Sequence, residues 1–133
     1  MRQISTIIFT LLSVTAMMAQ GWPSQYKGIM LQGFYWDSYA DTQWANLESQ
    51  ADELAEFFNL IWIPQSGKSA GYPKNSMGYD DLYWFTDYTS SFGNEEQLRS
   101  MISTFKAKGL GTIADVVINH RASLADTWMS FPI

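Results

Sequence analysis

The residues best suited to chemistry lie near the end of the chain, in the run Asp115-Val116-Val117-Ile118-Asn119-His120. Asp115 interrupts an apolar stretch over residues 110–118, and a carboxylate in a buried strand costs several kcal/mol unless it is paired or coordinated. Strand alternation places Asp115 and Asn119 on one side, and His120 follows where the predicted strand gives way to a loop. The alternatives are a capping role for Asn119 and a structural, hydrogen-bonded role for His120. Their position at the carboxyl end of a strand favours function.

A second candidate is the aromatic loop, which we define as residues 72–92. Its rings are Tyr72, Tyr79, Tyr83, Trp84, Phe85, Tyr88 and Phe92. Flat rings suit the apolar faces of sugars, and the tyrosine hydroxyl adds a hydrogen-bonding group. The alternative is that the rings pack the loop onto the rest of the domain, because a long loop needs a small core of its own. We expect most rings to pack and at least one to bind a ligand.

The elements that must position these residues alternate between strands and helices. Apolar stretches predict strands over residues 28–34, 60–63 and 110–118, and the second is typical of a strand covered on both faces. Asp41 is the predicted cap of a first helix that ends near Asn59. Its apolar face comprises Trp44, Leu47, Ala51, Leu54, Ala55 and Phe58.

A second helix opens at residues 94–97, which combine a capping asparagine with acids in the first turn, and it stops at Gly109. Its apolar face comprises Leu98, Met101, Ile102 and Phe105. The resulting order of strand, helix, strand, long loop, helix and strand implies a parallel sheet with right-handed crossovers.

Two parallel architectures fit this order. A doubly wound nucleotide-binding fold would need a glycine-rich phosphate loop after the first strand, but bulky rings fill that turn in Gly33-Phe34-Tyr35-Trp36-Asp37. A (β/α)8 TIM barrel places its functional loops at the carboxyl ends of strands, where the aromatic residues lie. Such a barrel takes roughly 250 residues. We therefore expect a partial barrel, in which only the first three βα steps are present.

Composition excludes several classes of protein. The chain has no cysteine, so zinc-cysteine, iron–sulfur and disulfide frameworks are excluded. A formal net charge of −5 argues against nucleic acid as a partner. With 47% hydrophobic residues, the chain is expected to fold.

Residues 1–19 read as a signal peptide. Arg2 supplies the positive start, an uncharged apolar stretch follows, and small residues end at Ala19. A buried helix or an uncleaved anchor is the alternative. We expect a secreted or periplasmic protein that makes no membrane contact after signal cleavage, with residues 20–133 as its folded part.

These residues resemble a known family. The run from Asp115 to His120 is similar to the first signature block of the α-amylase family, glycoside hydrolase family 13. Three further blocks resemble the plant and bacterial liquefying-type α-amylases at the same mutual spacing: Met30-Leu31-Gln32-Gly33-Phe34-Tyr35-Trp36-Asp37, Gly78-Tyr79 and Phe92-Gly93-Asn94-Glu95. The resemblance covers the chain from about Trp22 to Trp128.

The resemblance implies a role for each matching residue. Tyr79 would stack under the sugar at the cleavage subsite, and His120 would hydrogen-bond that sugar and favour the transition state. Asp115 would be a supporting carboxylate at the floor of the cleft. Asn119 would give its side-chain oxygen to a structural calcium ion, a hard cation that takes six to eight oxygens.

The resemblance also implies an activity, which is hydrolysis of internal α-1,4-glucosidic bonds of starch, glycogen or maltooligosaccharides by a retaining mechanism. The nucleophile and the acid/base residue would lie beyond Ile133, so we expect the N-terminal, truncated part of a catalytic barrel that is inactive alone, and a monomer when complete. Two alternatives stay open. One is a non-catalytic carbohydrate-binding module that uses the aromatic loop, and the other is a related barrel glycosidase that cleaves trehalose or isomaltose.

Overall fold

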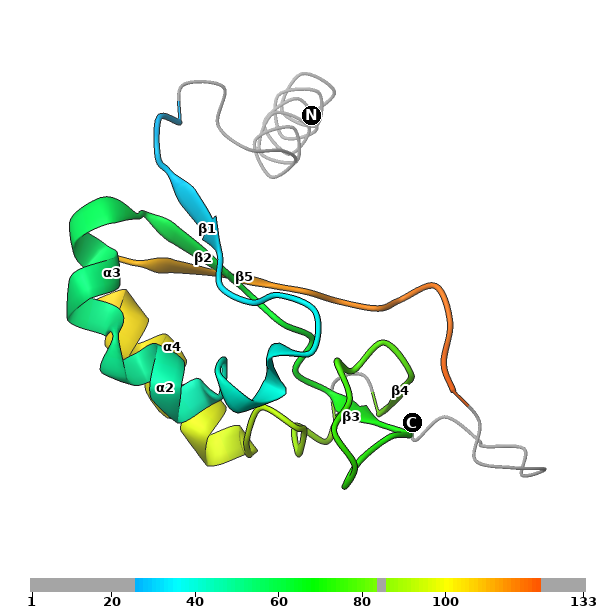
Figure 1. Cartoon of the computed structure of the whole chain (residues 1–133). Helices are drawn as coiled ribbons and strands as arrows, with labels where there is room; N and C mark the ends of the chain where they lie inside the picture. The colour runs from blue at the N-terminus through cyan, green and yellow to red at the C-terminus, as the bar shows by residue number, and fades with distance from the viewer. Residues whose placement is uncertain (1–25, 84–85, 123–133) are drawn as a thin grey trace, which may run out of the picture.

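The computed structural model describes residues 26–83 and 86–122. In this part of the chain, three parallel strands form one sheet in the order β1 (Met30–Gln32), β2 (Leu60–Ile63) and β5 (Gly111–Ala114) (Figure 1). Leu60 of β2 lies opposite Met30 on one side and Gly111 on the other. The parallel α/β sheet that the sequence predicts is therefore present. The predicted signal peptide lies outside the described residues.

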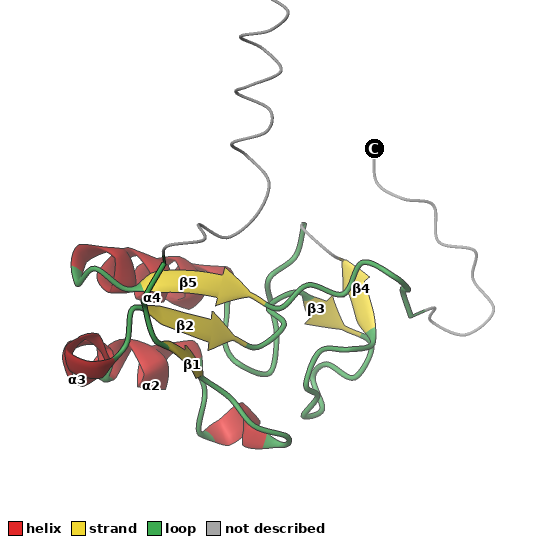
Figure 2. Cartoon of the chain, turned by 90° about the horizontal axis from the view of Figure 1, so that it is seen from above, coloured by secondary structure: helices red, strands yellow, loops and turns green. Residues whose placement is uncertain are grey.

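A layer of helices covers one face of this sheet (Figures 1 and 2). The layer contains α2 (Trp44–Ser49), α3 (Ala51–Phe57) and α4 (Glu95–Ala107). The core between sheet and helices includes Trp44, Ile61, Ile63, Phe92, Met101 and Phe105. Leu60 and Trp62 alternate with the buried isoleucines of β2 and are only half-buried, so the expectation that this strand is covered on both faces is wrong for the described residues.

The predicted first helix is divided into two and begins later than its pattern suggested. A short helix, η1 (Ser38–Ala40), comes first, and Asp41 ends it rather than capping α2. Gln43 precedes α2 without a side-chain cap, and the backbone N–H of Trp44 donates to the carbonyl of Phe92 at 2.8 Å. Gln50, with φ −94° and ψ 3°, separates α2 from α3.

The second helix, α4, confirms its predicted start and stop. The side chain of Asn94 accepts from the backbone N–H of Gln97 at 2.9 Å, and the Gln97 side chain accepts from the Asn94 N–H at 3.0 Å, which makes a capping box. Gly109 follows the helix with φ +80°, a conformation that favours glycine. Of the predicted apolar face, Ile102 alone is exposed.

The long segment between β2 and α4 contains a small antiparallel sheet that the sequence did not reveal. It pairs β3 (Lys68–Ser69) with β4 (Asp81–Tyr83). Figure 2 shows the arrowheads of β2 and β5 pointing toward this sheet, so it lies beyond the carboxyl ends of the parallel strands. None of the helices in the described part of the chain is long and apolar enough to span a bilayer.

Candidate functional site

Three segments that follow the parallel strands meet near the small sheet. The first is the turn after β1 with Trp36, the second is the loop after β2 with Tyr79, and the third is the segment after β5 with Asp115 and His120. The carboxyl ends of parallel strands lie at one edge of a sheet, which is why residues distant in sequence converge there.

Asp115 lies just beyond β5, not inside a strand. The predicted strand over residues 110–118 ends at Ala114, and the Asp115 side chain is half-buried. The hydroxyl group of Tyr79 donates a hydrogen bond of 3.0 Å to its Oδ2 atom. The partner that a carboxylate at this position requires thus comes from the aromatic loop.

Tyr79 is held at three points. Its hydroxyl group contacts Asp115, its carbonyl oxygen lies 2.9 Å from Nε2 of His120, and its ring stacks on the ring of Trp36 with centroids 6.0 Å apart and planes 7° apart. Burial and the hydrogen bond to Asp115 raise the pKa of Tyr79 to about 12. The ring is therefore a neutral, fixed platform at physiological pH.

His120 is exposed, and its contact with Tyr79 determines which ring nitrogen carries the proton. A carbonyl oxygen can only accept, so Nε2 must donate in this hydrogen bond. In the neutral ring, Nδ1 is then the acceptor. The structure thus brings together three residues that the sequence singled out, namely Tyr79, Asp115 and His120.

Asn119, the predicted calcium ligand, is exposed. Among residues 26–83 and 86–122 there is no group of three or more His, Cys, Asp or Glu side chains that could hold a metal ion. Calcium takes six to eight oxygen ligands, so the described residues alone do not fit it. The role of Asn119 stays a prediction.

Trp36 is the site residue that sequence reasoning missed. It is 70% exposed although it stacks on Tyr79, and it borders a depression of about 380 Å³ between the turn after β1 and residues 75–80. Asp37, Tyr39, Met77, Tyr79 and Asp80 also line this depression. The available signal was the run of bulky residues after β1, which argues against a phosphate loop and belongs to one of the blocks that carry the family resemblance.

The rings of the aromatic loop divide between packing and exposure. Phe92 is 1% exposed and packs against Trp44 with ring centroids 5.3 Å apart, so it belongs to the core. Tyr83 and Tyr88 are half-buried, and Tyr72 is exposed. Trp84 and Phe85 lie outside the described residues. The expectation that rings of this loop pack is confirmed for the described residues, and the expectation that at least one ring binds a ligand stays a prediction.

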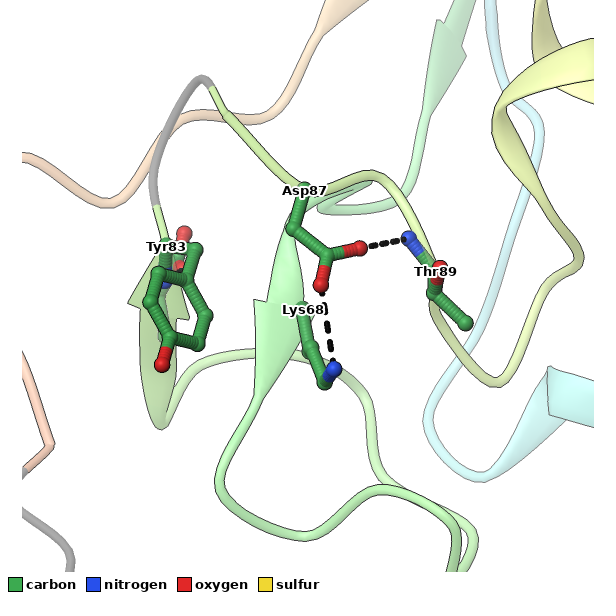
Figure 3. A network of polar contacts seen from close by, with 5 residues as sticks. Lys68, Tyr83, Asp87 and Thr89 are labelled. Carbon is green, nitrogen blue, oxygen red and sulfur yellow. Dashed lines mark hydrogen bonds and ion pairs between the residues drawn. The ribbon is translucent and has the colours of Figure 1, made fainter.

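An ion pair connects β3 to residues 87–89 of the aromatic loop (Figure 3). The ammonium group of Lys68 lies 3.0 Å from Oδ2 of Asp87, and the backbone N–H of Thr89 donates to Oδ1 at 2.9 Å. Partial burial acts to raise the pKa of Asp87, but hydrogen bonds from Thr89 and Lys68 together lower it. The Asp87 carboxylate therefore stays charged and links Lys68 of β3 to the segment over residues 87–89.

Comparison with known families gives a match over the second half of the chain. The family model described as "Alpha amylase, catalytic domain" matches residues 58–130.

Individual relatives agree with this match. The chain is 33% identical over 97 residues to "Alpha-amylase 3, chloroplastic" of Arabidopsis thaliana, an alignment that covers 71% of this chain and 10% of the relative. It is 30% identical over 136 residues to "Glucan 1,4-alpha-maltohexaosidase" of Bacillus sp. (strain 707), covering 95% of this chain and 25% of the relative. The chain thus spans a quarter or less of the length of these relatives.

Solved structures show the same fold. The crystal structure of a mutant of MutB in complex with sucrose aligns with a TM-score of 0.57 and 22% sequence identity, over 77% of this chain and 19% of that chain. This neighbour is a TIM-barrel enzyme, so the likeness supports an α/β arrangement around a parallel sheet.

Proposed function

This chain belongs to the family of α-amylase catalytic domains, and we propose on that basis that it forms the first three βα steps of a (β/α)8 barrel in an enzyme that hydrolyses internal α-1,4-glucosidic bonds of starch or glycogen. The observation that carries the proposal is the cluster of Trp36, Tyr79, Asp115 and His120 at the carboxyl ends of the strands. Active sites of TIM barrels are built at this end.

In the proposed site, Tyr79 supplies the platform for a glucose ring. Sugars present apolar C–H faces that pack on aromatic rings, and a fixed ring binds without an added entropic cost of ordering. Trp36 and Asp115 hold the ring in place, one through stacking and one through the hydroxyl group. Asp115 is thus a supporting carboxylate, because one of its oxygens is already committed to Tyr79.

His120 contributes a hydrogen bond to the same sugar. Because Nε2 donates to the carbonyl of Tyr79, Nδ1 is the ring atom left to accept from a sugar hydroxyl group. A hydrogen bond that strengthens as the oxocarbenium-like transition state forms lowers the barrier, whereas one of constant strength only improves binding. We assign His120 to the first kind.

The bond-breaking step itself needs two further carboxyl groups. A retaining glycosidase places a nucleophile and an acid/base residue about 5 to 5.5 Å apart. We propose that both lie outside residues 1–133, and that this chain alone does not hydrolyse glucan.

Two further parts of the proposal concern calcium and export. Asn119 would contribute one oxygen ligand to a structural calcium ion whose other ligands come from outside the described residues. Residues 1–19 would direct export to the periplasm or the medium and be removed. Sequencing the N-terminus of the exported protein tests the second part, since a start near Gln20 is expected and an intact Met1 would contradict it.

Steady-state kinetics on maltoheptaose test the proposed site, using the complete protein that carries this chain at saturating calcium. His120→Asn should lower kcat about ten- to a hundredfold and change KM less, because it removes a transition-state hydrogen bond. Tyr79→Ala should act mainly on KM, because a platform contacts ground state and transition state alike. An unchanged kcat in a folded His120→Asn variant would return this residue to a structural role.

The same measurement separates the rival function. A non-catalytic carbohydrate-binding module would retain maltoheptaose without releasing reducing sugar, and Tyr79→Ala would then weaken retention alone. Hydrolysis by the complete protein that depends on His120 would exclude the binding module.

A further inference from the structure

A buried polar pair, Gln65 and Asp81, lies close to the backbone that leads into Tyr79. Asp81 is 1% exposed and Gln65 is 2% exposed. One carboxylate oxygen of Asp81 accepts from Nε2 of Gln65, and the other accepts from the backbone N–H of Tyr83 at 2.9 Å. The Gln65 amide oxygen in turn accepts from the backbone N–H of Gly67. Burying a carboxylate is costly unless hydrogen bonds compensate, so the pair exists only because its partners are fixed.

The pair also lies where the two segments of the site come together. The carbonyl oxygen of Asp81 accepts from the backbone N–H of Ala122 at 2.9 Å, two residues after the contact between Tyr79 and His120. Residues 79–81 and 120–122 are thus joined at alternate positions. Burial raises the pKa of Asp81, and the nearby charge of Arg121 opposes that rise.

Backbone atoms at Gly67 and Gly78 approach this pair closely. A Cβ atom on Gly67 would lie 2.9 Å from Oδ2 of Asp81, and one on Gly78 would lie 3.2 Å from Cβ of Gln65. Gly78 has φ +89° and directly precedes Tyr79, so Gln65 packs under the backbone that leads into the platform. A change in the hydrogen bonding of the pair is therefore felt by the backbone next to Tyr79.

We propose that Gln65 and Asp81 are positioning residues that set the placement of Tyr79 relative to His120, and thereby the affinity of the site for α-glucan. Neither side chain touches the sugar. The inference rests on the proposed function for its substrate, but the placement of the two segments can be measured without any substrate.

The chemistry of the pair offers a reciprocal test in the complete protein that carries this chain. Asp81→Asn alone places an amide N–H group opposite the donating amide of Gln65. Gln65→Glu alone places a second carboxylate opposite that of Asp81. The double variant Gln65→Glu/Asp81→Asn exchanges the two groups. In it, the carboxylate introduced at position 65 can accept from the new amide, and the asparagine oxygen can still accept from the backbone N–H of Tyr83. The backbone N–H of Gly67 also keeps an acceptor at position 65.

Two readouts apply, namely hydrogen–deuterium exchange of residues 116–122 and KM for maltoheptaose. Each single variant should speed exchange in that segment and raise KM at least about threefold, and the double variant should restore both, because buried unsatisfied groups cost far more than satisfied ones. The control is Asp52→Asn, which loses an exposed ion pair with Lys108 outside the aromatic loop and should change neither readout.

The outcomes are distinct. Lower thermal stability with unchanged exchange and unchanged KM would overturn the positioning role and leave the pair merely structural. If the wild-type protein does not act on maltoheptaose, the proposed function fails, and the exchange data alone still decide whether the pair places the two segments. If both single variants fail to fold, Gln65→Met removes the donor to Asp81 and the acceptor of the Gly67 N–H without introducing repulsion, and the same two readouts decide.

Discussion

The hydroxyl group of Tyr79 and the carboxylate of Asp115 share a hydrogen bond of 3.0 Å across 36 positions of sequence. One residue belongs to the aromatic loop, and the other directly follows the parallel strand β5. Loops carry function when a rigid scaffold fixes them, and this bond transfers the rigidity of the sheet to the tip of the loop. The consequence is chemical as well as geometric, because the phenol acquires an unusual pKa.

The first prediction concerns that pKa. Burial and the Asp115 hydrogen bond hold the folded-state pKa of Tyr79 at about 12, above the ordinary value of 10.0. The folded state therefore keeps this proton when the unfolded state has lost it, so its stabilising effect is full below pH 10 and disappears as the pH rises to 12. Absorbance at 295 nm should show a late tyrosine transition whose amplitude Tyr79→Phe reduces.

The substitution Asp115→Asn tests how much of the rise in the Tyr79 pKa comes from the hydrogen bond. The variant should lower the pKa of Tyr79 without returning it to the ordinary value, because burial is the larger cause and remains. Hydrogen bonds to Asp41 and Asp37 also raise the pKa values of Tyr35 and Tyr39, so a late transition of unchanged amplitude in folded Tyr79→Phe is the result that would contradict the prediction.

The second prediction concerns Trp36. Its ring lies parallel to that of Tyr79 with centroids 6.0 Å apart, and such pairs are worth about 0.5 to 1.5 kcal/mol. Trp36→Ala should therefore weaken maltoheptaose binding about two- to tenfold, as measured by isothermal titration calorimetry. The neighbouring Tyr35→Phe variant serves as control, because Tyr35 is exposed and its hydroxyl group bonds to Asp41. Equal loss of affinity in both variants would refute a specific role for Trp36.

Sequence periodicity predicts an element correctly when its start, its apolar face and its end are all determined by residues close together in the sequence. The helix α4 has its cap, its apolar face and its terminal glycine within one continuous segment, and its start and stop were predicted. The division of α2 from α3 was not predictable in this way, and the start of α2 was misplaced because Asp41, the expected cap, instead ends η1. The contact from the N–H of Trp44 to the carbonyl of Phe92 at this start is tertiary and has no local signal.

The site residues, too, were predicted only where neighbouring residues in the sequence pointed to them. Asp115 and His120 stood out because polar residues follow an apolar run, but nothing local showed that both would contact Tyr79. Trp36, Gln65 and Asp81 were missed for the same reason, because the contacts that suggest a role for them are made with residues on another segment. The small sheet of β3 and β4 was missed because its strands are too short to show a period.

The third prediction tests the capping box of α4. Asn94→Ala removes the side-chain oxygen that accepts from Gln97 and should lower the free energy of unfolding by about 1 kcal/mol. Chemical denaturation followed by circular dichroism measures the change. Asn75→Ala, at an exposed loop position, should change it little. Equal effects of the two variants would show that the cap does not stabilise the helix.

The last prediction concerns the contact between α2 and α4. One carboxylate oxygen of Glu48 accepts from the hydroxyl groups of Ser100 at 2.8 Å and Thr104 at 2.7 Å. Glu48→Ala should lower the free energy of unfolding by about 1 kcal/mol, and Glu48→Gln by less, because the amide oxygen can still accept. Asp52→Asn breaks an ion pair with Lys108 in which the Asp52 side chain is 82% exposed, so it should cost less than about 0.5 kcal/mol. If a double-mutant cycle between Glu48→Ala and Thr104→Ala shows full additivity, the two helices are held by apolar packing alone.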